Sequence, residues 1–261
     1  MTSEHHIVVQ DDSETGPRLK YWSRAAVTAY WTELWTKVDT GSYDRERKGH
    51  LPHQLRGTFV KWVKPGSRVL EAGCGLGHFT VAAAAKGYRA EGVDWSAVTI
   101  DKLRGRFPEI PWHVGDVRKL DFEDGTFDAV YSPGVVEHFE EGPTEILQET
   151  HRILAPGGHA IVSTPCFNRW MQRHPDRFTS TGSSAGEFYQ YAFKREGMAA
   201  LLGRIGFEVV QILPYGSLST LSIYGGWKVP TPLVKPVAVA MDYALPTKAW
   251  GSTCIWVARR R

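Results

Sequence analysis

The chain has 261 residues, of which 42% are hydrophobic and 23% are charged, a composition that excludes the disordered and fibrous classes and suits one α/β domain. Its net charge of +3 is too small to indicate a polyanionic partner, because nucleic-acid binders usually carry a strongly basic face. The cysteines Cys74, Cys166 and Cys254 are far apart and odd in number, so we expect no disulfide framework, no CxxC metal site and a cytoplasmic location.

The N-terminal part is expected to be a flexible tail followed by two helices. Residues 1–20 lack the basic and then apolar segments of a secretory signal and indicate a flexible acidic tail. Apolar side chains recur at helical spacing in residues 24–38, which predicts an amphipathic helix on the body of the protein. A second helix is predicted in LPHQLRGTFVKWV, before Pro65-Gly66. We expect residues 24–64 to form cap helices.

From Ser67 onward, short β-rich runs alternate with helical stretches, which predicts right-handed crossovers and a parallel sheet. The expected strands are SRVLEAG, YRAEGVD, IPWHVGD, FDAVYS, HAIVSTP, FEVVQIL and STCIWVARR, and the helices are FTVAAAAKG, SAVTIDKLRGRF, TEILQETHRIL and FKREGMAALLGRIG. We therefore predict a Rossmann-like, doubly wound, mostly parallel seven-stranded α/β sheet with helices on both faces. One domain over residues 21–261 would contain a cofactor-binding core at 67–165.

Two segments do not fit a minimal sheet and are expected to be substrate lids. Residues 166–192 have no clear period but are rich in aromatic and basic side chains, and residues 214–251 form a second insertion. In open α/β sheets such segments surround the ligand crevice. We expect no membrane-spanning helix in residues 209–227, because proline and glycine interrupt this uncharged stretch.

A glycine-rich turn follows the first strand of the expected core. SRVLEAG continues into Gly73-Cys74-Gly75-Leu76-Gly77 before a helix, where backbone amides can meet a ligand with no Cβ in the way. Asp94 ends the second strand, where a carboxylate can accept both hydroxyls of a ribose. Asp116 ends the third strand, where it can accept from an adenine amino group. The three strand ends together predict a site for one adenosine.

Glu71 distinguishes two classes of cofactor. Dinucleotide folds prefer G-x-G-x-x-G, which faces a pyrophosphate, whereas this turn is G-x-G-x-G and Glu71 precedes it. A carboxylate there would repel phosphate and would suit the cationic amino group of an amino acid, directly or through a water. S-adenosylmethionine joins an adenosine to an amino acid without phosphate, so it is the expected cofactor.

Five segments occur in order: VLEAGCGLGHFT, GVDWS, GDVRKLDF, FDAVYSPGVVEHF and HRILAPGGHAIV. Together they resemble the successive motifs of class I S-adenosylmethionine-dependent methyltransferases, most closely the ubiquinone-biosynthesis-type branch. The resemblance covers roughly residues 60–165, with a weaker echo in FYQYAFKREGMAALLGRIGFEVV.

The resemblance implies a role for each matching residue. The methionine part would be bordered by Glu71, Gly73, Gly75 and Gly77, with Cys74 as a small residue inside the same turn. Asp94 would hold the ribose, Trp95 would pack on the adenine, Asp116 and Val117 would recognise its edge, and Ser132 would lie near the methionine backbone.

The expected reaction is an in-line displacement at a sulfonium carbon, so the protein mainly has to position the acceptor and exclude water. A hydroxyl acceptor would benefit from a general base, and His138 is the predicted catalytic residue because it follows the fourth strand. The alternative is that His138 only packs or orients its loop; His174 and Tyr131 are weaker candidates for the base. The histidines show no HxxxH or HxH pair, so no metal is expected.

Three other functions stay open at this point. A nicotinamide-dependent oxidoreductase shares the glycine turn and the strand-end carboxylate, a cofactor-binding scaffold would have lost catalysis, and a nucleic-acid methyltransferase would need a more basic face. The expected acceptor is a small molecule or a lipid-like compound, since residues 209–227 and the stretch VAVAMDYAL are largely apolar. No nucleic-acid partner is expected, contact with a membrane surface stays open, and neither the methylated atom nor the oligomeric state is predicted.

Overall fold

The computed structural model describes residues 5–23, 42–177, 187–218, 233, 236–237, 240–241 and 250–261. The predicted helix in residues 24–38 and most of the predicted insertion 214–251 therefore lie outside the described residues. Within the described ranges, no helix combines the length and the apolar composition that a bilayer span requires.

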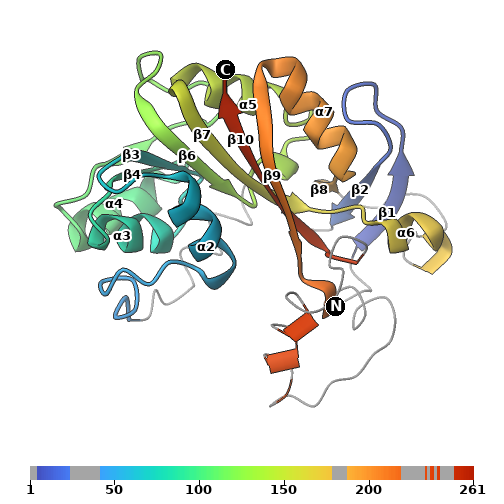
Figure 1. The fold of residues 1–261 in the computed structure, drawn as a ribbon, viewed down its shortest axis with the longest axis horizontal. Helices are drawn as coiled ribbons and strands as arrows, with labels where there is room; N and C mark the ends of the chain where they lie inside the picture. The colour runs from blue at the N-terminus through green and yellow to red at the C-terminus, as the bar shows by residue number, and fades with distance from the viewer. Residues whose placement is uncertain are drawn as a thin grey trace.

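Seven strands form the main sheet (Figure 1). They are β3 (Arg68–Ala72), β4 (Arg89–Asp94), β5 (Trp112–Val114), β6 (Phe127–Pro133), β7 (Leu154–Pro165), β9 (Phe207–Tyr215) and β10 (Thr253–Arg260). Their order is β5-β4-β3-β6-β7-β10-β9. The pairs among β3 to β7 are parallel, whereas β10 runs antiparallel to both β7 and β9. The prediction of a mostly parallel seven-stranded α/β sheet is confirmed.

Helices cover both faces of this sheet (Figure 1). One face carries α2 (His53–Trp62) and α3 (His78–Ala85), with α4 (Ala97–Arg106) packed beside α3, and the other carries α5 (Thr144–Ile153) and α7 (Arg195–Ile205).

The two cores follow from the alternation of side chains along each strand. Val69 and Tyr131 pack with α2 and α3, whereas Leu70 and Val130, their neighbours in the chain, pack with α5 and α7. Both sets are buried because a parallel sheet between two helical layers meets no water on either face.

A second, three-stranded antiparallel sheet lies beside the main one (Figure 1). It has the order β1-β2-β8 and consists of β1 (His5–Gln10), β2 (Arg18–Ser23) and β8 (Glu187–Ala192). Within residues 166–192 the structure also contains α6 (Arg169–Arg173) and a short 3₁₀ turn, η2 (Pro175–Arg177).

For residues 5–20, this second sheet corrects the expectation of a flexible tail over residues 1–20. Residues 5–10 and 18–20 are strand residues, and the turn between them is held by Asp12, which accepts the Thr15 amide and pairs with Arg18. Local sequence patterns did not reveal these strands because β2 pairs with β8, which is distant in the chain. Leu19 is completely buried in a hydrophobic cluster that includes Phe167 and Met171.

Candidate functional site

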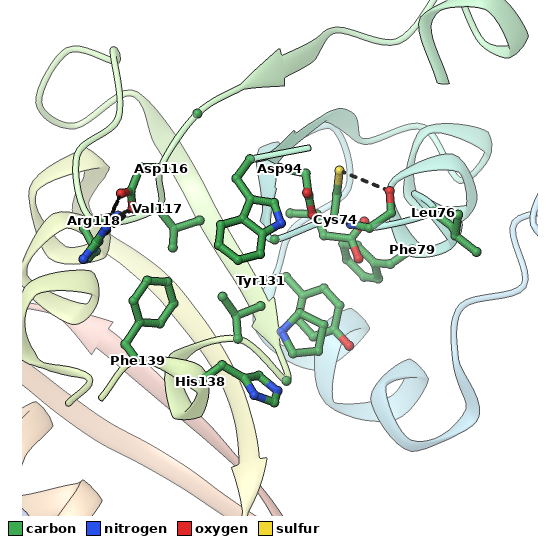
Figure 2. Close-up of a pocket in the computed structure, with 18 of the residues that line it drawn as sticks. Cys74, Leu76, Phe79, Asp94, Asp116, Val117, Arg118, Tyr131, His138 and Phe139 are labelled. Atoms are coloured by element: carbon green, nitrogen blue, oxygen red, sulfur yellow. Dashed lines mark hydrogen bonds and ion pairs between the residues drawn. The ribbon is translucent and has the colours of Figure 1, made fainter. Parts of the chain in front are cut away.

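A cavity of about 980 Å³ opens at the carboxyl edge of the main sheet, where β3, β4, β5 and β6 end. Its lining includes nine of the eleven residues predicted from sequence: Glu71, Gly73, Cys74, Gly75, Asp94, Trp95, Asp116, Val117 and His138. In Figure 2, Asp94 and Cys74 lie on one side of this space, and His138 and Phe139 lie on the other. The carboxyl ends of parallel strands converge at one edge, so residues from four separate segments face a common space.

The glycine turn needs glycine for two different reasons. Gly73 has a φ of +77°, and a Cβ there would lie 2.4 Å from Cγ2 of Val135, so a side chain would be both strained and obstructed. Gly77 has a φ of +70°, and its Cβ would lie 2.6 Å from Cη2 of Trp112. Gly73 therefore permits close approach of the loop that carries His138, whereas Gly77 allows α3 to begin in contact with Trp112. Gly77 lies outside the described lining of the cavity.

Glu71 is a buried carboxylate at the inner end of the cavity. It accepts hydrogen bonds from the backbone amide of Thr80 at 3.0 Å and from the Thr80 hydroxyl at 2.5 Å, both donated by α3. Burial raises the pKa of Glu71 to about 8, because desolvation disfavours the charged form more than the Thr80 bonds favour it. A cation next to Glu71 would stabilise the charged form of the carboxyl. Its binding would therefore release the proton of Glu71 and form an ion pair.

Asp94 is fixed by two backbone donors. The Gly75 amide donates to Oδ2 at 2.9 Å and the Ser96 amide donates to Oδ1 at 3.0 Å, while burial raises the pKa of the carboxyl. Each carboxylate oxygen can accept a second hydrogen bond. Asp94 is thus oriented to accept from two neighbouring hydroxyls, one at each oxygen.

Asp116, Val117 and Trp95 form the adjacent part of the wall. The Arg118 guanidinium donates to both oxygens of Asp116 at distances of 2.7 to 3.1 Å, and these bonds lower the pKa of Asp116. Val117 is buried, whereas Trp95 is 42% exposed and presents a large apolar surface to any planar ligand. Sequence reasoning did not foresee the Arg118 bond, which holds Asp116 in place.

His138 ends the 3₁₀ helix η1 (Val136–His138) and faces the cavity from the side opposite Asp94 (Figure 2). Its Nδ1 lies 2.8 Å from the carbonyl oxygen of Tyr189 on β8. A carbonyl only accepts, so Nδ1 donates, and in the neutral ring Nε2 carries the lone pair. Burial lowers the pKa of His138, so the ring is neutral near pH 7 and able to accept a proton.

The two weaker candidates for the base are less suited to accept a proton. Tyr131 lines the cavity, but burial raises the pKa of its phenol well above the usual value, so the phenol keeps its proton. His174 is outside the described lining of the cavity, and its Nδ1 is 2.9 Å from the Trp170 carbonyl.

Ser132 differs from the other predicted residues. It is completely buried and lies outside the described lining of the cavity, between Tyr131 and Pro133, which both line it. Side chains alternate along β6, so when Tyr131 and Pro133 face the cavity side, Ser132 points to the opposite face of the sheet.

Part of the cavity wall consists of residues that were not named individually from the sequence, although Glu187 and Phe188 belong to the expected lid segment 166–192. Trp22 and Phe188, paired across β2 and β8, line it together with Phe139, Glu140, Glu141 and Glu187. The aromatic and acidic types gave no local signal, because their convergence depends on the long-range pairing of β2 with β8.

Comparison with known proteins shows the family of the chain. A family model described as "Methyltransferase domain" matches residues 43–212, which is well over half of the chain. The chain belongs to this methyltransferase family. The matched range contains the ends of β3, β4, β5 and β6, which border the cavity described above.

Curated relatives agree with this assignment. A probable S-adenosylmethionine-dependent methyltransferase of Mycolicibacterium smegmatis is 32% identical over 148 residues, which is 57% of this chain and 54% of that protein. The EEF1A lysine methyltransferase 4 of Mus musculus is 29% identical over 164 residues, covering 56% of this chain and 63% of that protein. The chain thus spans about half the length of the first curated relatives that it matches.

Solved structures share the fold. A protein from Pyrococcus horikoshii aligns with a TM-score of 0.59 at 21% identity, covering 89% of this chain and 99% of that one. The 1,6-didemethyltoxoflavin-N1-methyltransferase of Burkholderia thailandensis, solved with 1,6-didemethyltoxoflavin and S-adenosylhomocysteine bound, aligns with a TM-score of 0.53 at 19% identity, covering 98% and 99%. The chain carries a methyltransferase domain, and the relative from Mycolicibacterium smegmatis is named for its dependence on S-adenosylmethionine.

The residues around the cavity fit this cofactor. The buried carboxylate of Glu71 suits an ammonium group, and the oriented carboxylate of Asp94 suits a pair of hydroxyls. A pyrophosphate would place negative charge beside both carboxylates, which disfavours the nicotinamide dinucleotide alternative.

Proposed function

We propose that the protein transfers a methyl group from S-adenosylmethionine to an oxygen, nitrogen or carbon atom of a small-molecule or lipid-like acceptor. The observation that carries the proposal is the shared cavity: Glu71 and Asp94 both line it, and a neutral His138 faces Asp94 across it (Figure 2). Its volume of about 980 Å³ is near the upper end of the range for one ligand, which leaves room for an acceptor beside the cofactor.

The cofactor would lie along the ends of β3, β4 and β5. Glu71 would receive its ammonium group beside the backbone of Gly73, Cys74 and Gly75, and Asp94 would accept from the two ribose hydroxyls. Trp95 would cover one face of the adenine, with Val117 packed on the ring and Asp116 at its edge. Gly77 and Ser132 would act indirectly, by letting α3 start close to the sheet and by filling the sheet behind the cavity.

S-adenosylmethionine supplies a methyl group activated by a positively charged sulfur. The protein then has to hold the acceptor in line with the carbon–sulfur bond, keep water out and remove a proton where the acceptor carries one. His138 can perform the last task at Nε2, since Nδ1 is engaged with the Tyr189 carbonyl.

Two finer assignments belong to the same proposal. The ubiquinone-biosynthesis-type branch is supported by the order of motifs in residues 60–165, and a cytoplasmic location by the three widely spaced cysteines, which are all free and buried.

Titration calorimetry with S-adenosylmethionine and with NAD, each added separately to the purified protein, tests the cofactor. We expect S-adenosylmethionine to bind and NAD not to bind. The reverse result would support the oxidoreductase alternative. Incubation with methyl-labelled S-adenosylmethionine and cell extract then tests catalysis. Cofactor binding without label transfer to any extract component would support the scaffold alternative.

A further inference from the structure

Part of the cavity lining is both aromatic and acidic. We define the acceptor wall as the lining residues Trp22, Phe139, Glu140, Glu141, Glu187 and Phe188. Trp22 and Phe188 are register partners on β2 and β8, so their rings come from adjacent strands. Glu187 precedes Phe188, and Tyr189, which follows it, provides the carbonyl that holds His138. The acceptor wall is therefore built next to the proposed base.

The described lining holds more acidic than basic groups, although burial raises the pKa of Glu71 to about 8, so this carboxyl is largely protonated near neutral pH until a cation approaches. Six lining residues are carboxylates, namely Glu71, Asp94, Asp116, Glu140, Glu141 and Glu187, and the described lining contains one arginine, Arg118, and no lysine. Two of the carboxylates have cationic partners: Arg118 pairs with Asp116 at 2.7 Å, and Lys20 pairs with Glu140 at 2.8 Å.

Four lining carboxylates remain once these two pairs are set aside. Glu71 and Asp94 face the proposed cofactor, whose ammonium, sulfonium and carboxylate groups sum to one positive charge. Among the described residues, Glu141 and Glu187 form no ion pair within 4 Å, although the charge of Arg118 also acts on Glu141 at longer range. An anionic acceptor would meet repulsion at this rim, and a cationic one would be attracted to it.

The acceptor wall already accommodates one ammonium group. Nζ of Lys20 lies 5.1 Å from the ring centroid of Trp22 and 5.5 Å from that of Phe188, while donating to Glu140. Aromatic faces attract cations through their quadrupole, and a neighbouring carboxylate adds direct charge attraction. Glu187, next to Phe188 in the chain, also lines the cavity, whereas the ring of Phe139 already carries the Arg118 guanidinium at 5.2 Å from its centroid.

We infer that the acceptor is a cationic amine with an apolar body, and that the methyl group is transferred to its nitrogen. This inference rests on the proposed function. The ammonium would approach along Glu187 and Glu141, with the apolar body against Phe188 and Phe139. The ammonium gives one proton to Nε2 of His138, and the nitrogen lone pair forms the new N–C bond as the C–S bond breaks and its electron pair stays on sulfur. The products are the methylated ammonium, neutral S-adenosylhomocysteine and an imidazolium that returns its proton to solvent.

The test compares matched compounds that differ in charge. 2-Phenylethylamine, 2-phenylethanol and 3-phenylpropionate are titrated by calorimetry into the protein saturated with S-adenosylhomocysteine, and methyl transfer from labelled S-adenosylmethionine to each is measured. We expect the amine to bind at least about tenfold more tightly than the alcohol, the carboxylate to bind weakest, and only the amine to be methylated. Equal or tighter binding of the alcohol or the carboxylate, or no binding of the amine, would overturn the inference.

Variants at the rim separate the acceptor wall from the cofactor site. Glu187→Gln should weaken amine binding about fivefold and leave alcohol binding and S-adenosylhomocysteine binding unchanged. Glu109→Gln, which removes an exposed carboxylate outside the described cavity lining, is the matched control and should change none of the three. Phe188→Leu keeps an apolar side chain but removes the ring, so it should reduce the preference for the amine over the alcohol.

The result distinguishes this inference from the function on which it rests. Failure of the protein to bind S-adenosylmethionine would refute the proposed function itself. Normal cofactor binding without a preference for the amine, or a Glu187→Gln variant with unchanged amine affinity, would refute only the assignment of a cationic acceptor.

Discussion

Replacing Asp94 with alanine tests the assignment of the ribose to this carboxylate. Two backbone amides, from Gly75 at 2.9 Å and Ser96 at 3.0 Å, fix the direction of the remaining lone pairs. A hydrogen bond to a charged group contributes about 1.5–3 kcal/mol, so a pair of ribose hydroxyls would contribute roughly 3–6 kcal/mol. Burial, which raises the pKa of Asp94, offsets part of this gain. We therefore expect a loss near the lower end, about 3 kcal/mol or roughly 150-fold in Kd.

Calorimetric titration with S-adenosylhomocysteine measures this loss without turnover. Alanine also leaves the Gly75 and Ser96 amides without their acceptor, so thermal unfolding must show that the variant is folded at the temperature of the titration. Asp101→Ala is the matched control, because this exposed carboxylate on α4 pairs only with Arg104 among the described residues. A folded Asp94→Ala protein whose Kd stays within a factor of three of the original would refute the ribose assignment.

Three further predictions follow from the same geometry. Glu71 has a pKa of about 8 in the folded protein against an ordinary value of 4.5, so the folded state binds the extra proton between these values. The Glu71 contribution to the free energy of unfolding should therefore fall as pH rises from about 4.5 to 8, and Glu71→Gln should flatten this fall in Tm. Cofactor affinity should rise over pH 6 to 8, by at most about tenfold per unit, and a pH-independent Kd in the original protein would contradict the proposed ion pair. His138→Gln should lower kcat by about 100-fold or more with the Kd for S-adenosylhomocysteine unchanged; parallel losses in both would make His138 a structural residue. Gly73→Ala should lower the free energy of unfolding by about 2–4 kcal/mol, from the positive φ and the overlap with Val135, as measured by urea unfolding. Gly57→Ala, on α2 with no atom within 4 Å of the added Cβ, is its control and should not be destabilised.

The main sheet was predictable because its signals are local. Each parallel strand is a short apolar run followed by a helix, and the faces of Leu70 and Val69 follow from simple alternation. The insertion of β10 between β7 and β9, and the pairing of β2 with β8, depend on contacts between distant segments. Contacts between distant segments leave no periodic pattern of apolar residues in the local sequence.

The cavity residues show the same difference between local signals and contacts of distant segments. Glu71, Asp94 and Asp116 were placed at one edge because parallel strands end together, and the structure brings all three to one space. Ser132 is buried and lies outside the described lining, because its side chain alternates with those of Tyr131 and Pro133, which line the cavity. Glu187 and Phe188 lie in the segment 166–192 that was expected to be a substrate lid, but their position beside Trp22 was not predictable, because the two strands meet only through the second sheet.

The bond between His138 and the carbonyl of Tyr189 affects how the site tolerates change. Many imidazole bases are oriented by a neighbouring acid, and one substitution can remove that acid. Here the orienting group belongs to the main chain, which every amino acid provides. Side-chain replacement at position 189 should therefore leave the tautomer of His138 intact, whereas inserting or deleting a single residue in β8 would displace the carbonyl. The tautomer of the base is thus sensitive to changes in chain length, whereas the Tyr189 side chain affects only the packing of the imidazole, through its edge contact at 5.4 Å between ring centroids.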